Sequence, residues 1–170
     1  MGYVFILGGA RSGKSDLADR LGREAGKPVT FIATATPGDA EMAERIARHR
    51  AARSSDWSTV EEPLDLLGAV RGCPPASYLV IDCLTLWVSN LLGARRSRDE
   101  IIALARAVAA EMSERAGVVV SNEVGLGIVP ASETGREFRD VLGAVNNVFA
   151  GRAERSLFVV AGRALELGPA

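Results

Sequence analysis

The sequence predicts one α/β domain built on a mostly parallel β-sheet. Three observations predict it: short, continuously apolar runs, helical stretches that alternate with them, and a glycine-rich loop after the first run. Strands are continuously apolar when helices cover both faces of their sheet, and alternation with helices is typical of parallel strands. The 170 residues have the length of one domain, so we expect residues 1–170 to form a single unit.

The first third of the chain contains two expected strands and two expected helices. Residues 3–7 (YVFIL) form an apolar run that ends in the glycine-rich loop, and residues 17–25 continue from that loop as a helix. Residues 29–33 (VTFIA) form the second apolar run. Residues 39–53 are amphipathic and rich in arginine, which predicts a helix with one solvated face.

The middle of the chain is divided by a clear breaker, GCPP at residues 72–75. Before it we expect a short strand at 57–61 and a helix at 64–71. After it, residues 78–81 (YLVI) are expected to form a buried strand that ends at Asp82.

The remaining elements repeat the same alternation. Helices are expected at 84–92, 99–115 and 133–150, and strands at 117–121 and 157–161; a glycine-rich loop occupies 122–130. In such a sheet, ligands bind at the carboxyl ends of the strands.

Composition excludes several classes of protein. The net charge is −1, from 20 basic and 21 acidic residues, whereas a general nucleic-acid binder usually has a basic excess. Cys73, Cys83 and the single histidine have neither the number nor the spacing of a Cys/His zinc site. No apolar run is long enough to span a membrane, and residues 1–7 are too short for a signal peptide. We therefore expect a cytoplasmic protein that binds no nucleic acid.

The loop between the first strand and the first helix matches the phosphate-binding pattern GxxxxGK[ST]. Its backbone N–H groups and the helix N-terminus would hold phosphate oxygens. The lysine would reach the β and γ phosphates, and the final hydroxyl would bind Mg²⁺. The matching residues are Gly8, Gly9, Ala10, Arg11, Ser12, Gly13, Lys14 and Ser15.

Asp82 is the predicted acidic partner of this loop. It follows a buried apolar strand, so its carboxylate would hold Mg²⁺ together with Ser15, directly or through water. The alternative is a helix cap, because Asp82 also precedes an expected helix. No NKxD element accompanies the loop, which disfavours a switch GTPase and leaves kinases, ATPases and nucleotidyltransferases open.

His49 is the only histidine and lies among arginines. On a helix, Arg45, His49 and Arg53 share one stripe, and the neighbouring cations favour a neutral, nucleophilic imidazole. The spacing alone favours the alternative, an exposed histidine on a helix whose arginines form a solvated face.

These residues together resemble the bifunctional adenosylcobinamide kinase/adenosylcobinamide-phosphate guanylyltransferase family of cobalamin biosynthesis. The resemblance covers nearly the whole chain and is carried by GGARSGKS (8–15), IATAT (32–36), EMAERIARHRAAR (41–53), residues 57–61, DCLTLWVSN (82–90), NEVGLGIVP (122–130) and FRD (138–140) through Asn146. The tail at 159–170 fits the family only loosely, Asn147 stands where many relatives have glutamine, and Asp82 stands where some have glutamate.

The resemblance implies a RecA-like P-loop NTPase fold, a propeller-like homotrimer and two reactions. ATP or GTP phosphorylates adenosylcobinamide, and GTP then donates GMP to that phosphate through a guanylylated histidine, which His49 matches. It also implies nucleotide contacts outside the phosphate loop, from residues matching Ala33, Thr34, Ala35, Arg50, Ala51, Ala52, Arg53, Glu61 and Asp82. A small-molecule P-loop kinase without the transferase step is the alternative, and a nucleotide-dependent switch module is disfavoured by the missing NKxD element.

Two groups of residues after the strand at 117–121 have more than one interpretation. Asn122 and Glu123 either face the ligand crevice or cap a loop. Arg139, Gly143 and Asn146 share one helical face, which fits a corrinoid contact, a subunit contact or a buried polar network.

Overall fold

The computed structural model describes residues 2–38, 40, 43–44, 47–48, 50 and 54–169. Within these residues, a seven-stranded sheet has the order β3-β2-β4-β5-β1-β6-β7, and every neighbouring pair is parallel except β6 and β7. The strands are β1 Tyr3–Gly8, β2 Val29–Ala33, β3 Ser58–Glu61, β4 Tyr78–Asp82, β5 Gly117–Val120, β6 Arg155–Val160 and β7 Arg163–Leu167. The predicted α/β class with a mostly parallel sheet is confirmed.

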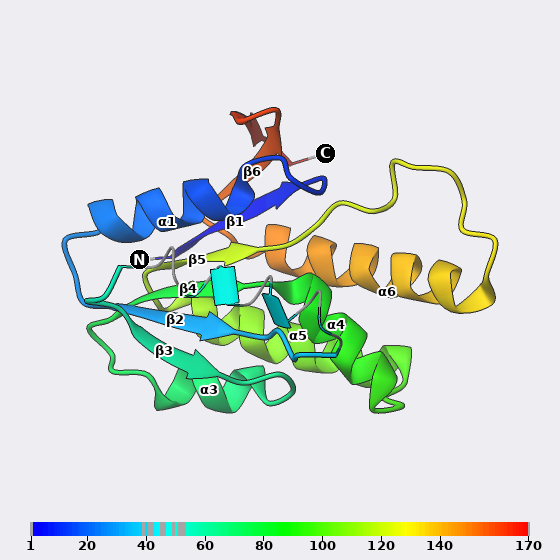
Figure 1. Cartoon of the computed structure of the whole chain (residues 1–170), viewed down its shortest axis with the longest axis horizontal. Coiled ribbons are helices and arrows are strands. Elements are labelled where there is room, and N and C mark those ends of the chain that lie inside the picture. The colour runs from blue at the N-terminus through cyan, green and yellow to red at the C-terminus, as the bar shows by residue number, and fades with distance from the viewer. Residues whose placement is uncertain are drawn as a thin grey trace.

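Helices cover both faces of the sheet, as the continuously apolar strands predict (Figure 1). The helices are α1 Lys14–Glu24, α3 Leu66–Gly72, α4 Leu84–Gly93, α5 Arg98–Ser113 and α6 Glu133–Ala150. Helix α1 lies over one face, and α3 to α6 lie over the other. Alternate residues of β1 therefore enter different cores: Phe5 packs with the α3–α6 layer, whereas Ile6 packs with Ala18 of α1.

The expected helix at 39–53 falls largely outside the described residues, and His49 is among those not described. The described residues within it have helical backbone; they are Ala40, Ala43, Glu44, Ala47, Arg48 and Arg50. The expected strand at 57–61 is present as β3. None of the helices in the described part of the chain is long and apolar enough to cross a membrane.

Strand β7 was not predicted from the sequence; it pairs antiparallel with β6 and forms an edge of the sheet. Val160 pairs with Arg163, so only Ala161 and Gly162 connect the strands. Both have positive φ, 48° and 71°, as a two-residue type I′ turn requires. Ala-Gly lacks the Asn or Asp that usually marks such a turn, and β7 is exposed throughout, so neither turn chemistry nor apolar pattern indicates this hairpin.

Substitutions in this turn should change stability in opposite directions. Ala161→Asn should raise the free energy of unfolding, and Gly162→Ala should lower it, each by about 1 kcal/mol, because asparagine tolerates the left-handed region and alanine does not. Urea unfolding followed by circular dichroism measures both changes. Equal effects of the same sign would contradict the turn geometry.

Candidate functional site

The phosphate-binding loop joins β1 to α1 in the predicted place. Gly13 is the N-cap of α1 and has φ of 99°, and Arg11 has φ of 53°. Only glycine adopts the Gly13 conformation without strain. Because α1 begins at Lys14, three residues before its predicted start, the loop residues lie at the positive end of the helix dipole, where an anion is stabilised.

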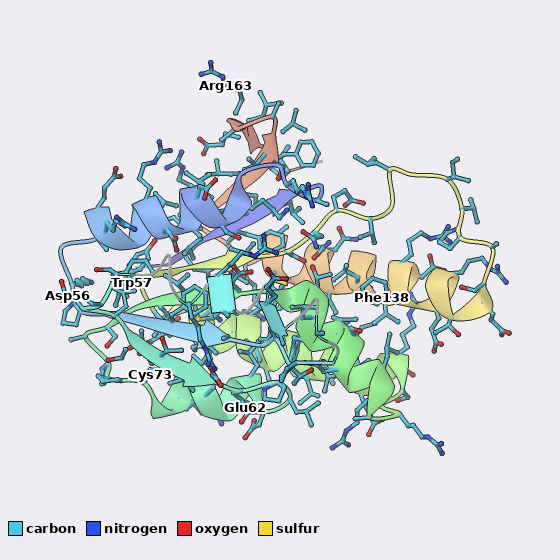
Figure 2. All side chains as sticks on the ribbon, viewed as in Figure 1. Asp56, Trp57, Glu62, Cys73, Phe138 and Arg163 are labelled. Atoms are coloured by element: carbon cyan, nitrogen blue, oxygen red, sulfur yellow. The ribbon has the colours of Figure 1, made fainter. Side chains whose placement is uncertain are left out.

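The loop is held from behind by the β6–β7 hairpin. A Cβ atom at Gly8 would lie 2.3 Å from the carbonyl oxygen of Val159 and 2.8 Å from Ser12 Oγ, so no larger residue fits there. The backbone N–H of Gly162 donates a hydrogen bond to the Ser12 carbonyl at 2.9 Å. The β6–β7 hairpin, whose second strand was not predicted, therefore fixes the shape of the phosphate-binding loop. Figure 2 shows Arg163, next to this turn, projecting away from the rest of the molecule.

Lys14 lies inside the loop and is almost completely buried. Its Nζ donates hydrogen bonds to the Gly9 carbonyl at 2.6 Å and to Ser12 Oγ at 3.4 Å. A buried ammonium is costly unless polar groups surround it, and these carbonyl and hydroxyl oxygens provide such groups. The loop thus concentrates one positive charge and several backbone donors in the predicted phosphate position.

Ser15 and Asp82 come together although they lie 67 residues apart. The Ser15 hydroxyl donates a hydrogen bond to Asp82 Oδ2 at 3.1 Å, with β5 lying between β1 and β4 in the sheet. The N-cap of α4 is Cys83, so Asp82 is not the helix cap that the alternative interpretation proposed. A hydroxyl and a carboxylate are hard oxygen donors of the kind that Mg²⁺ prefers, so this pair fits the metal.

The register of the sheet places further predicted residues in one row at its carboxyl edge. Glu61 of β3 pairs with Ala33 of β2, and Ala33 pairs with Asp82 of β4. Adjacent strands are about 4.8 Å apart, so the row extends roughly 10 Å from Asp82 to Glu61. This is the scale of a nucleotide lying across the edge of the sheet.

Thr34 connects β2 to the turn after β4. Its buried hydroxyl donates to the Cys83 carbonyl at 2.7 Å and accepts from the Cys83 N–H at 3.0 Å. Its own backbone carbonyl accepts from Asn90 Nδ2. These bonds hold Ala33 beside Asp82. The nucleotide contacts of Ala33, Thr34 and Ala35 stay predictions. Burial raises the pKa of the Cys83 thiol to about 12, and the neighbouring Asp82 charge adds to this effect, so the thiol is protonated and unreactive.

A hollow of about 440 Å³ lies beside Glu61 at the β3 edge. Arg50 forms an ion pair with Glu61 across it, and Trp57 forms part of its wall. The Trp57 ring stacks on Phe31, with 6.5 Å between ring centroids, and a Cβ at Gly22 would meet the same ring at 2.7 Å. Two predicted contacts therefore lie in one concave site. The others from that segment, Ala51, Ala52 and Arg53, lie outside the described residues, as does His49.

The residues after β5 separate into two roles. Asn146 is buried; it accepts a hydrogen bond from Ser121 Oγ at 2.6 Å and donates one to the Asn122 carbonyl at 3.1 Å. Of the three interpretations of this residue, the structure therefore supports the buried polar network. The Glu123 N–H donates to the Gly8 carbonyl, and its carboxylate accepts from the Gly125 N–H. These hydrogen bonds join the loop after β5 to the phosphate-binding loop. They support loop capping, one of the two interpretations of Asn122 and Glu123.

The sheet, the phosphate-binding loop and the Ser15–Asp82 pair define a P-loop NTPase fold. The model of the family described as cobinamide kinase / cobinamide phosphate guanyltransferase matches residues 4–167, and the chain belongs to this family.

Two curated relatives are similar over almost their full length. The chain is 48% identical to the bifunctional adenosylcobalamin biosynthesis protein CobP of Pseudomonas aeruginosa, over 95% of each chain. It is 37% identical to the bifunctional adenosylcobalamin biosynthesis protein CobU of Escherichia coli, over 94% of this chain and 96% of the relative. Among solved structures, the flagellar accessory protein FlaH from Methanocaldococcus jannaschii has a similar fold. Its TM-score is 0.51 and its sequence identity 14%, over 98% of this chain and 77% of that one.

Asp82→Asn should remove the Mg²⁺ dependence of GTP binding. The asparagine oxygen still accepts from Ser15, so the loop keeps its shape, but the charge that attracts the cation is lost. We expect GTP affinity in Mg²⁺ to fall about tenfold, toward the value that the wild type shows in EDTA. Calorimetric titration with and without Mg²⁺ measures the difference. If the variant still gains as much from Mg²⁺ as the wild type, Asp82 is not a metal ligand.

Proposed function

We propose that this chain catalyses two successive reactions of cobalamin biosynthesis. It phosphorylates the hydroxyl of adenosylcobinamide with ATP or GTP, and it then transfers GMP from GTP to the new phosphate, giving adenosylcobinamide-GDP and pyrophosphate. The observation that carries the proposal is the Ser15–Asp82 pair beside a complete phosphate-binding loop, in a chain that belongs to a cobinamide kinase and guanylyltransferase family. The row from Asp82 to Glu61 gives the bound nucleotide a defined direction along the sheet edge.

The phosphate-binding loop would bind and orient the triphosphate. Backbone N–H groups at the start of α1 donate to phosphate oxygens, and Lys14 stabilises the negative charge that develops during transfer. Ser15 and Asp82 would hold Mg²⁺, which neutralises phosphate charge when it is bound. In the first reaction the acceptor oxygen bonds to the γ phosphorus, the bond to the β–γ bridging oxygen breaks, and the hydroxyl proton leaves to solvent.

His49 would carry the guanylyl group between two displacements. Its neutral imidazole nitrogen attacks the α phosphorus of GTP, the bond to the α–β bridging oxygen breaks, and pyrophosphate leaves. An oxygen of the acceptor phosphate then attacks the same phosphorus and releases the imidazole. Arg48 and Arg50 flank the histidine in sequence and are exposed, so the segment supplies positive charge for this chemistry.

GTP labelled at the α phosphate tests this step directly. We expect the wild type to retain label after denaturation, in an acid-labile and alkali-stable form, and His49→Ala to retain none, because a phosphorus–nitrogen bond has that stability. The control is GTP binding by His49→Ala, which shows that the variant is folded. An unlabelled wild type that binds GTP would reject the covalent step and favour the kinase without a transferase.

Glu61 is suited to select guanine over adenine. Guanine presents two adjacent donors, N1–H and the exocyclic amine, and one carboxylate accepts from both. Adenine offers no such pair. Glu61 lies at the far end of the row from the phosphate-binding loop, beside the hollow walled by Trp57, and its charge is held in place by Arg50. We infer that the base occupies this hollow.

Glu61→Gln should weaken GTP binding much more than ATP binding. Glutamine replaces one acceptor with a donor that faces a guanine donor, so GTP affinity should fall about 10- to 100-fold, whereas ATP affinity changes less than about twofold. Competition titrations with both nucleotides measure the ratio. Glu24→Gln, which removes an exposed carboxylate from α1, is the matched control. Equal losses for both nucleotides would place the base elsewhere.

We also propose a homotrimer in the cytoplasm, where its nucleotide substrates are found. The loop between β5 and α6 exposes Leu126, Ile128 and Val129, which are 80%, 98% and 63% accessible. Contiguous apolar side chains of this kind favour a subunit contact.

A further inference from the structure

A second cavity, of about 500 Å³, lies along the middle of α6 and shares no lining residue with the hollow at Glu61. Helix α6 supplies Arg139, Asp140, Gly143 and Asn147, the first residue of α5 supplies Arg98, and the loop after β5 supplies Gly125. Figure 2 labels Phe138, which directly precedes Arg139 on α6. The sequence pattern already placed Arg139 and Gly143 on this face of α6, and none of the proposed steps on the nucleotide uses these residues.

The cavity presents hydrogen-bond donors and acceptors side by side. Arg139 Nε and Nη2 both contact Asp140 Oδ1, at 2.8 Å each, which directs their donors to one oxygen. The second oxygen, Asp140 Oδ2, therefore remains an acceptor, and Arg139 Nη1 remains a donor, among the contacts of the described residues. The Arg98 guanidinium adds further donors, and the Asn147 carboxamide offers one group of each kind.

The carboxylate in this cavity stays ionised. The Arg139 hydrogen bond lowers the pKa of Asp140, and the charges of Arg139, Arg98 and Arg136 lower it further. Arg136 itself donates to the carbonyls of Pro130 and Ala131, so it also fixes the end of the loop beside the cavity. The acceptor is therefore permanent at neutral pH, and the cavity is not simply a receptor for anions.

Gly143 lies in the middle of α6, where glycine is unfavourable for a helix, and faces this cavity. A Cβ at this position would meet nothing within 4 Å, so packing inside the chain does not require glycine here. By contrast, the glycines at 8 and 22 are required by neighbouring atoms. A helix that keeps glycine facing open space leaves room for the close approach of another group.

The cavity is at a suitable distance from the nucleotide site for an extended acceptor. Asn146 connects α6 to the end of β5, and the loop after β5 is bonded to Gly8 of the phosphate-binding loop. Asn147, next to Asn146, lines one end of the cavity, and Arg139, eight positions earlier, lies about 12 Å farther along the helix. One molecule could therefore contact the cavity with one edge while its reacting arm reaches the phosphates.

We propose that this cavity binds the carboxamide-bearing rim of the corrinoid acceptor; the assignment rests on the proposed function. A primary carboxamide has one acceptor oxygen and two donor hydrogens, which match Arg98 or Arg139 on one side and Asp140 or Asn147 on the other. Gly143 allows the flat ring to approach the helix backbone. Because the rim is the same before and after phosphorylation, the cavity serves both reactions.

Equilibrium dialysis of adenosylcobinamide and adenosylcobinamide phosphate, followed by their visible absorbance, tests the assignment. Gly143→Leu should weaken binding of both corrinoids at least about tenfold, and Arg98→Met and Asn147→Ala about three- to tenfold. Leucine is the better helix former, so thermal unfolding of Gly143→Leu should show a fold at least as stable as the wild type. Arg106→Met removes an exposed guanidinium from α5 outside the cavity and should bind both corrinoids like the wild type.

Three results would overturn the assignment. The first is unchanged corrinoid binding by Gly143→Leu. The second is a loss confined to the phosphorylated corrinoid, which would make the cavity a phosphate site. The third is a parallel loss of GTP binding, which would show a general disturbance. A wild type that binds GTP but neither corrinoid would instead reject the proposed function itself.

Discussion

The close approach of β1 and β6 behind the phosphate-binding loop is the constraint on which the site depends. Gly8 has no room for a side chain because the Val159 carbonyl lies where a Cβ would be. The Gly162 N–H holds the Ser12 carbonyl from the same side. With its back fixed by two strands, the loop keeps its N–H groups and Lys14 directed to one position. A preorganised site of this kind binds phosphate without first reorganising its dipoles.

Strand order then determines which side chains share the carboxyl edge. The sheet places β5 between β1 and β4, and Ser15 on the first turn of α1 reaches Asp82 across that gap. The two hydrogen bonds between Thr34 and Cys83 hold β2 against the same turn, so Ala33 stays in register between Glu61 and Asp82. Side chains alternate between the two faces of a strand. A shift of one residue in either pairing would therefore turn Glu61 or Asp82 to the opposite face.

The sequence predicted those parts of the fold that local chemistry specifies. The apolar strands, the loop at 8–15 and the acid at the end of β4 each have a pattern that is visible within a few residues. The hairpin after Val160 has no such pattern, because Ala161 occupies a turn position that asparagine or glycine usually fills, and β7 buries no apolar face. The role of Thr34 was also not predictable, since its partner at Cys83 is 49 residues away and contributes only backbone atoms.

Helix α6 carries the buried amide network and the polar cavity along the same turns, because Asn146 belongs to the network and its neighbour Asn147 lines the cavity. Near its C-terminus, Asn146 is buried and bonded to the residues that follow β5, which fixes the helix relative to the phosphate-binding loop. The polar cavity extends from Asn147 through Gly143 to Arg139, and the N-terminal part of the helix passes beyond the sheet (Figure 1). A rigid helix transmits position along its axis, so the buried amide network sets the distance between the cavity and the phosphates. Phosphoryl and guanylyl transfer both require the reacting oxygen to lie in line with phosphorus, and a misplacement of about 1 Å can cost a factor of about 100 in rate. The buried asparagine therefore contributes to alignment as well as to stability, although it contacts neither substrate.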